Sequence, residues 1–66
     1  MNLIPTRYGP KFAILEDENG DFIPKLLDKG RWLTLPDTQA FFKFKDDAER
    51  AIGQYLQKQS EKANGS

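Results

Sequence analysis

Short apolar runs separated by turn residues fill the first two thirds of the chain, and a helical period follows. Residues 11–15 (K-F-A-I-L) favour a strand with Phe12 and Ile14 on one face, and residues 22–27 favour a return strand. Between them, residues 18–21 read E-N-G-D. Asn-Gly between two apolar runs predicts a β-hairpin with a type I′ turn, in which both central residues have positive φ.

The remaining strand signals are weaker. Pro24 lacks an N–H group, so we expect its strand to lie at a sheet edge or to be bulged. After a turn at residues 28–30, residues 31–35 alternate as a third strand, with Leu33 and Leu35 on the face opposite Trp32 and Thr34. Residues 36–39 are a loop, and residues 40–44 are expected to add a short fourth strand.

A helix is expected from Asp46 onward. Asp46 suits the N-cap, and Glu49 three residues later completes a capping box. Gly53 inside the helix costs roughly 1 kcal/mol relative to Ala, but its missing side chain would allow close approach to the sheet. A single apolar stripe follows the helical period: Ala48, Ala51, Ile52, Tyr55 and Leu56.

These elements predict an α+β fold, a three- to four-stranded antiparallel β-meander packed against one C-terminal α-helix. The domain is expected over residues 11–59, preceded by an extended arm (1–10) and followed by a flexible tail (60–66). Both sides of such a sheet carry large apolar groups, and one helix covers only one side. We therefore expect function on the other side. Burial of Trp32 and all five Phe rings inside the monomer would contradict this expectation.

The composition excludes several kinds of catalytic and metal-binding chemistry. The 66 residues contain no Cys and no His, which removes the thiol nucleophile, the commonest general base and the usual zinc ligands. Ser60 and Ser66 fall in the expected tail, far from any base, so the sequence indicates a protein that is not an enzyme and uses no cofactor. No run approaches the roughly 20 apolar residues of a transmembrane helix. A cytoplasmic location without a membrane partner is expected.

The first hairpin has an acidic tip. Asp17, Asn19 and Asp21 have the spacing of the first three ligands of a calcium loop, but Phe22 stands where that loop requires Gly. The favoured interpretation is a solvated tip without metal, which also offers an acidic contact to a basic partner. The carboxylates of this acidic tip are Glu16, Asp17, Glu18 and Asp21.

A protein-binding surface is the leading hypothesis. Trp32 and Arg31, together with Phe41 and Phe42, have the composition of an interface hot spot. The alternative is that the N-terminal arm folds over the second face and buries Trp32. If the arm does not, a protein partner or a second copy should cover it.

Nucleic-acid binding is the second hypothesis, because cations beside an aromatic ring on a sheet can follow phosphates and stack a base. A three-stranded sheet backed by one helix resembles, in topology, the arm-site-binding N-terminal domains of tyrosine recombinases, which implies insertion of the sheet into the major groove. Ten Lys and Arg balance ten Asp and Glu, so no net charge attracts DNA. The candidate cations are Lys11, Lys25, Arg31, Lys43 and Lys45.

The sequence thus favours a small non-enzymatic protein-binding module, of the size of the regulators and inhibitors of larger host proteins that phages and mobile elements encode. A DNA-binding accessory domain is the alternative, and a structural homodimer is the third hypothesis.

Overall fold

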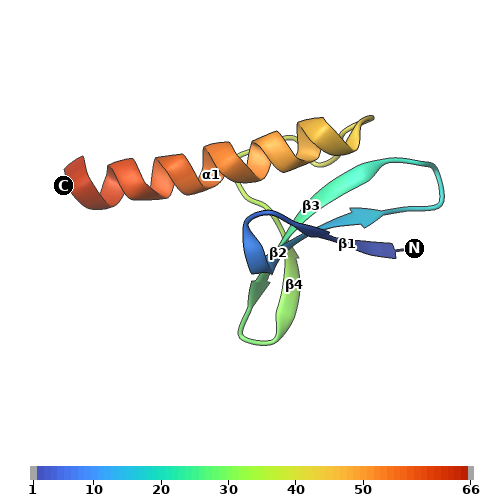
Figure 1. Cartoon of the computed structure of the whole chain (residues 1–66), viewed down its shortest axis with the longest axis horizontal. Coiled ribbons are helices and arrows are strands. Elements are labelled where there is room, and N and C mark those ends of the chain that lie inside the picture. The colour runs from blue at the N-terminus through green and yellow to red at the C-terminus, as the bar shows by residue number, and fades with distance from the viewer. Residues whose placement is uncertain (1, 66) are drawn as a thin grey trace.

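Four antiparallel strands form one sheet in the order β1-β2-β3-β4, and one helix lies across it (Figure 1). The computed structural model describes the backbone of residues 2–65 and the side chains of residues 2–61. The predicted β-meander packed against a C-terminal helix is confirmed. The elements are β1 (Asn2–Thr6), β2 (Gly9–Glu16), β3 (Phe22–Asp28), β4 (Arg31–Thr34) and α1 (Lys45–Gly65).

The core lies between α1 and the middle of the sheet, where α1 packs against β2 and β3. Phe12 and Ile14 of β2 alternate onto this side, as the period of two predicts, and Ile14 is 1% exposed. From the helix, Ala48 and Ile52 are fully buried against them. The predicted apolar stripe of α1 is therefore the face that packs on the sheet.

The N-terminal segment belongs to the sheet. Residues 2–6, expected as part of an arm, form β1 and pair with β2, with Ile4 opposite Ile14. In contrast, residues 40–44 contribute only an isolated bridge, in which Phe42 exchanges two backbone hydrogen bonds with Phe22. The prediction of a strand there was wrong, because the ladder position beside β3 is filled mainly by β4.

Pro24 lies in an interior strand, so the prediction of an edge or a bulge at this point was wrong. The Pro24 carbonyl accepts a hydrogen bond from the Leu35 N–H group at 3.1 Å. Its nitrogen therefore faces the side on which β4 has already ended at Thr34. Because no ladder bond to β2 depends on a donor at this residue, the sheet accommodates the proline.

The turn between β2 and β3 differs from the predicted type, whereas the turn between β3 and β4 lies where it was expected. In the hairpin of β2 and β3 only Gly20 has positive φ (81°), and the Gly20 N–H group donates to the Asp17 carbonyl. This is a three-residue loop with glycine in the left-handed region, in place of the predicted type I′ turn. The turn between β3 and β4 has positive φ at both Lys29 (51°) and Gly30 (80°), the pattern of type I′.

Gly53 is a point of close approach between α1 and the turn that joins β1 to β2. A Cβ atom on Gly53 would lie 2.5 Å from the Tyr8 hydroxyl oxygen and 3.2 Å from Cζ of that ring. The glycine permits a close approach, but the side chain that uses the space is Tyr8 of the turn and not a residue of a strand as expected.

The helix begins and ends differently from prediction. It starts at Lys45, and the Phe44 carbonyl accepts the first bond, from the Ala48 N–H group. Glu49 forms no capping box and instead accepts a hydrogen bond from the Arg7 guanidinium at 2.9 Å. The helix continues to Gly65, through most of the expected tail 60–66, of which Ser66 and the side chains from residue 62 lie outside the described residues.

Candidate protein-binding face

The side of the sheet turned away from α1 carries a continuous set of apolar residues. Leu15 is paired with Leu3 on one side and with Ile23 on the other, and Leu27 is paired with Trp32. Directly opposed residues point to the same side of a sheet, so these side chains share one face. We call this surface the open face; its paired residues are Leu3, Pro5, Ala13, Leu15, Ile23, Lys25, Leu27, Trp32 and Thr34, and the alternation of β2 places Lys11 on the same side.

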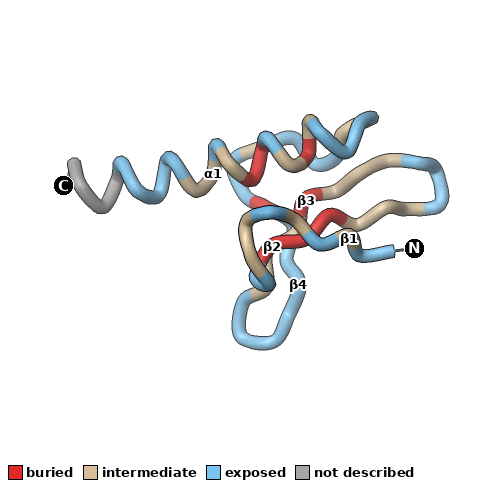
Figure 2. Tube along the Cα trace, in the orientation of Figure 1, coloured by how far each residue is buried: buried red, intermediate tan, exposed pale blue. Residues whose placement is uncertain are grey.

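No described element of the chain covers the open face. Leu3 is 46% exposed and Trp32 is 37% exposed, whereas Leu15, Ile23 and Leu27 are half-buried and Ala13 in the middle of the face is 5% exposed. The buried positions of the chain gather where α1 crosses the sheet, whereas β4 is exposed along its whole length (Figure 2). The N-terminal segment extends the sheet sideways as β1, so the alternative in which an arm folds over Trp32 is not what the structure shows.

The β3–β4 hairpin presents Trp32 at one end of this face. The end of β3 and all of β4 bend away from α1 (Figure 1). The hairpin therefore receives no cover from the helix on its other side either, and Leu33 on that side is 44% exposed. The rigid type I′ turn at Lys29 and Gly30 fixes the direction of the hairpin.

The cation Lys25 lies among these apolar groups. The Lys25 ammonium group donates a hydrogen bond to the Thr34 hydroxyl at 3.0 Å, across the β3–β4 pair. The bond holds the charged end over the sheet while the aliphatic stem adds to the apolar surface. The centre of the open face thus combines a hydrophobic floor with the positive charge of Lys25.

The four residues predicted for protein binding do not form one surface. Trp32 lies on the open face, and Arg31, its neighbour in β4, alternates to the opposite side. Phe42 is half-buried against the core. Phe41 is 46% exposed, but it lies in the segment that leads to α1. The structure does not bring these aromatics together, because Phe42 packs against the core.

Sequence reasoning missed most of the open face. Ile23 and Leu27 alternate with the core-facing residues of β3, and this period of two was available in the sequence. Leu15 follows the same pattern in β2. Leu3 could not be found this way, since its place depends on the pairing of β1 with β2.

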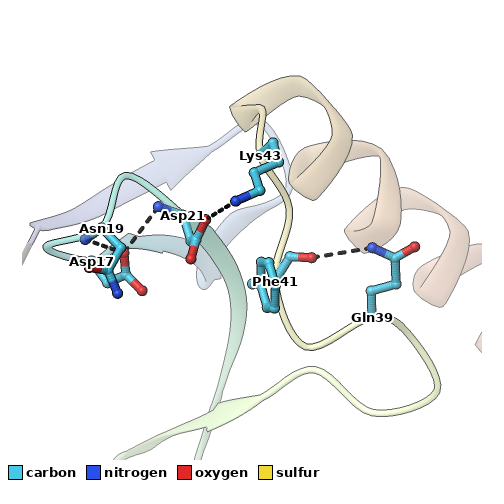
Figure 3. Close-up of polar contacts among 6 residues, drawn as sticks. All are labelled: Asp17, Asn19, Asp21, Gln39, Phe41 and Lys43. Carbon is cyan, nitrogen blue, oxygen red and sulfur yellow. Dashed lines mark hydrogen bonds and ion pairs between the residues drawn. The ribbon is translucent and has the colours of Figure 1, made fainter.

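The acidic tip is tied internally at two of its four carboxylates (Figure 3). Asp17 Oδ1 accepts hydrogen bonds from the N–H groups of Asn19 (2.9 Å) and Asp21 (3.0 Å), which closes the turn. Asp21 accepts a bond from Lys43 Nζ at 3.3 Å, and that ammonium also lies 5.7 Å from the centre of the Phe41 ring. Among the described residues, no group of three or more acidic or metal-ligating side chains is placed to hold an ion.

The five predicted nucleic-acid contacts are dispersed. Lys25 is on the open face, Arg31 alternates to the other side, and Lys43 is paired with Asp21 beside the first hairpin. Lys11 is exposed on the open-face side of β2, and Lys45 is exposed at the start of α1. The sheet therefore does not assemble these cations into one basic surface.

A hollow lies between the segment before α1 and the helix itself. It has a volume of about 650 Å³ and is lined by Phe41 and Phe44 together with Lys43, Asp47 and Arg50. Its charges alternate in sign and its aromatic rings are at the rim, where Phe44 is 67% exposed. It is a wide, mixed surface without the apolar continuity of the open face.

One ion pair perturbs the titration of described groups. The hydrogen bond from Arg7 lowers the pKa of the Glu49 carboxyl below its ordinary value, and the same bond raises the pKa of Arg7. This pair joins the β1–β2 turn to α1 and lies on the helix side of the sheet. It links the turn to the helix and does not belong to the open face.

No helix in the described part of the chain has both the length and the apolar character needed to cross a bilayer. Comparison with protein-family models, with curated proteins and with solved structures finds no match.

Proposed function

We propose that this protein is a non-enzymatic protein-binding module that docks a partner on the open face. The observation that carries the proposal is the apolar side of the sheet, with Leu3 and Trp32 at its two ends and no described element of the chain above it. Contiguous apolar surface exposed on a small domain is typical of interaction sites. A role as regulator or inhibitor of a larger protein suits a module of this size.

The chemistry of the open face indicates the chemistry of the partner. Trp32 is an anchor of the type that dominates interface energetics, and the leucines and Ile23 provide a flat surface around it. Lys25 at the centre favours a partner segment that brings one carboxylate among its apolar residues. The surrounding apolar contacts would exclude water from that charge pair.

DNA binding receives less support from the same surface. Two cations, Lys11 and Lys25, lie on this side among the described strand residues, whereas phosphate recognition requires several. The apolar side chains of the face offer no hydrogen bonds to base edges or phosphates. A protein partner therefore suits the face better than a duplex does.

The test is capture of partners from cell lysate by the immobilised chain, followed by titration of the recovered partner. Trp32→Ala and Leu3→Lys alter the two ends of the open face at exposed positions. Trp32→Ala is expected to weaken binding by roughly 2 kcal/mol or more, the size of a hot-spot truncation. Phe44→Ala is the matched control, because it also removes an exposed aromatic ring but lies on the helix side.

Two results would contradict the proposal. One is a partner whose affinity is unchanged by Trp32→Ala and Leu3→Lys but is lost in Phe44→Ala. The other is binding of DNA in a gel shift that falls steeply with salt, by a log–log slope of about 0.9 for each phosphate contact. Binding through the open face should change little over the same salt range.

A further inference from the structure

The outer edge of β4 carries unpaired backbone groups in a regular pattern. On the side of β3 that faces β4, Phe22 bonds to Phe42 and the Pro24 carbonyl accepts from Leu35. Hydrogen-bonded and non-bonded pairs alternate along an antiparallel ladder, so Trp32 and Thr34 occupy the non-bonded positions opposite β3. Their N–H and C=O groups point to the free edge, and no described backbone group pairs with them.

The two edges of the sheet are not equivalent. The same alternation directs the backbone groups of Leu3 and Pro5 to the outer side of β1, and Pro5 has no N–H group to offer. A proline on an edge strand prevents the addition of a further strand. Strand β4 contains no proline, and its register with β3 is unbroken. The β4 edge is therefore open to a fifth strand, and the β1 edge is obstructed.

We propose that β4 pairs antiparallel with β4 of a second copy of this chain, so that two sheets join into one of eight strands. Placing Leu33 on the two-fold axis brings Trp32 of each copy opposite Thr34 of the other. Each such pair exchanges two bonds, so both donors and both acceptors at the edge of each copy are satisfied. The edge is thus complementary to itself, as a two-fold interface requires.

Side chains and charges agree with this arrangement. Leu33, exposed to 44%, would meet its own copy at the axis and become buried. Arg31, the one charged residue of β4, lies two positions from the axis, and the whole chain has ten acidic and ten basic residues, so no net charge opposes association. Paired residues keep their faces, so the two open faces would form one continuous platform. The inference rests on the edge of β4 and not on the proposed function.

Sedimentation of the full chain over concentrations from about 10 µM to about 1 mM tests the proposal. The weight-average mass should rise from 7.6 kDa toward twice that value. Thr34→Pro removes an outward N–H group that the dimer needs and should therefore leave the chain monomeric. The variant should still fold, because no bond to β3 uses this donor. Thr34→Val is the matched control: it also loses the Lys25 contact, but it keeps the N–H group and should dimerise.

Hydrogen exchange supplies a second readout. The amides of Trp32 and Thr34 should gain protection as the wild-type concentration rises, whereas the Leu3 amide on the far edge should not. Circular dichroism establishes whether Thr34→Pro is folded. If Thr34→Pro is unfolded, Leu33→Lys serves as the test variant. It keeps every backbone bond of the ladder but places two ammonium groups side by side at the two-fold axis, so it should abolish the dimer in low salt.

Three results would overturn the proposal. The first is a wild-type chain that stays monomeric at the highest concentration. The second is a dimer that a folded Thr34→Pro variant, or Leu33→Lys, leaves as strong as before. The third is a dimer that Leu3→Lys abolishes, because Leu3 lies on the opposite edge and this result would place the second copy on the open face. Loss of partner capture by Leu3→Lys with the dimer intact would separate the two proposals.

Discussion

The contact between Gly53 and Tyr8 predicts that Gly53→Ala changes the free energy of unfolding in opposite directions with and without the Tyr8 side chain. Gly53→Ala should stabilise an exposed helix by about 1 kcal/mol, because Ala is the better helix former. Here the new methyl group would lie 2.5 Å from the Tyr8 hydroxyl oxygen, so the ring must move. Overpacking of this kind costs about 1–3 kcal/mol. We expect Gly53→Ala to lower the free energy of unfolding of the wild-type chain by about 1 kcal/mol.

In a Tyr8→Ala background the obstruction is gone, and the same substitution should raise the free energy of unfolding by about 1 kcal/mol. The coupling between the two sites is then about 2 kcal/mol, within the range found for residues in contact. Urea denaturation followed by circular dichroism gives the four values of the cycle, provided that the slope m stays constant. Gln54→Ala is the control, since this exposed neighbour should change stability equally in both backgrounds.

A coupling below about 0.5 kcal/mol, the level at which independent sites simply add, would refute the reasoning. It would mean that the Tyr8 ring leaves its position without cost and that the close approach contributes nothing to stability. A Gly53→Ala variant more stable than the wild-type chain would have the same consequence.

Three further predictions follow from particular contacts. Ile52→Ala should lower the free energy of unfolding by about 2–5 kcal/mol in urea titrations, because Ile52 is fully buried, whereas Phe44→Ala should change it by about 0.5 kcal/mol or less. Gly20→Ala should cost roughly 1–2 kcal/mol although the site is uncrowded, since only φ (81°) opposes a side chain; equal stability of the two chains would contradict this. The Glu49 pKa is lowered in the folded state, so the Arg7 contact stabilises the chain above the ordinary glutamate pKa and is lost as pH falls through the folded-state pKa. Glu49→Gln should therefore flatten the fall of stability on acidification, and an unchanged pH profile would show that the pair contributes nothing.

Local signals in the sequence were sufficient for most elements of the fold. The Asn19-Gly20 pair predicted the hairpin of β2 and β3, because glycine readily adopts positive φ there. Alternation placed Phe12 and Ile14 in the core, and the helical period identified the buried face of α1. These features depend on residues no more than a few positions apart.

The candidate site was predicted only in part. The sequence indicated that one helix leaves a side of the sheet uncovered and that Trp32 is found there. It grouped Trp32 with Phe42, which the structure buries against the core. An aromatic residue in the sequence can either close the core or remain exposed. Which of the two occurs depends on which strand lies beside it in the folded sheet.

The sequence by itself determined the helix, the hairpins and the inner face of each strand, because backbone propensity and periodicity act between near neighbours. Only the tertiary structure decided that residues 2–6 form an edge strand, that Glu49 bonds to Arg7 and that Tyr8 rests on Gly53. The contacts of Glu49 with Arg7 and of Tyr8 with Gly53 join segments far apart in the chain, and many such pairings are equally compatible with the local pattern. Packing selects among them, since it is the joint burial of Ile4, Ile14 and Ile52 that fixes where β1 and α1 lie.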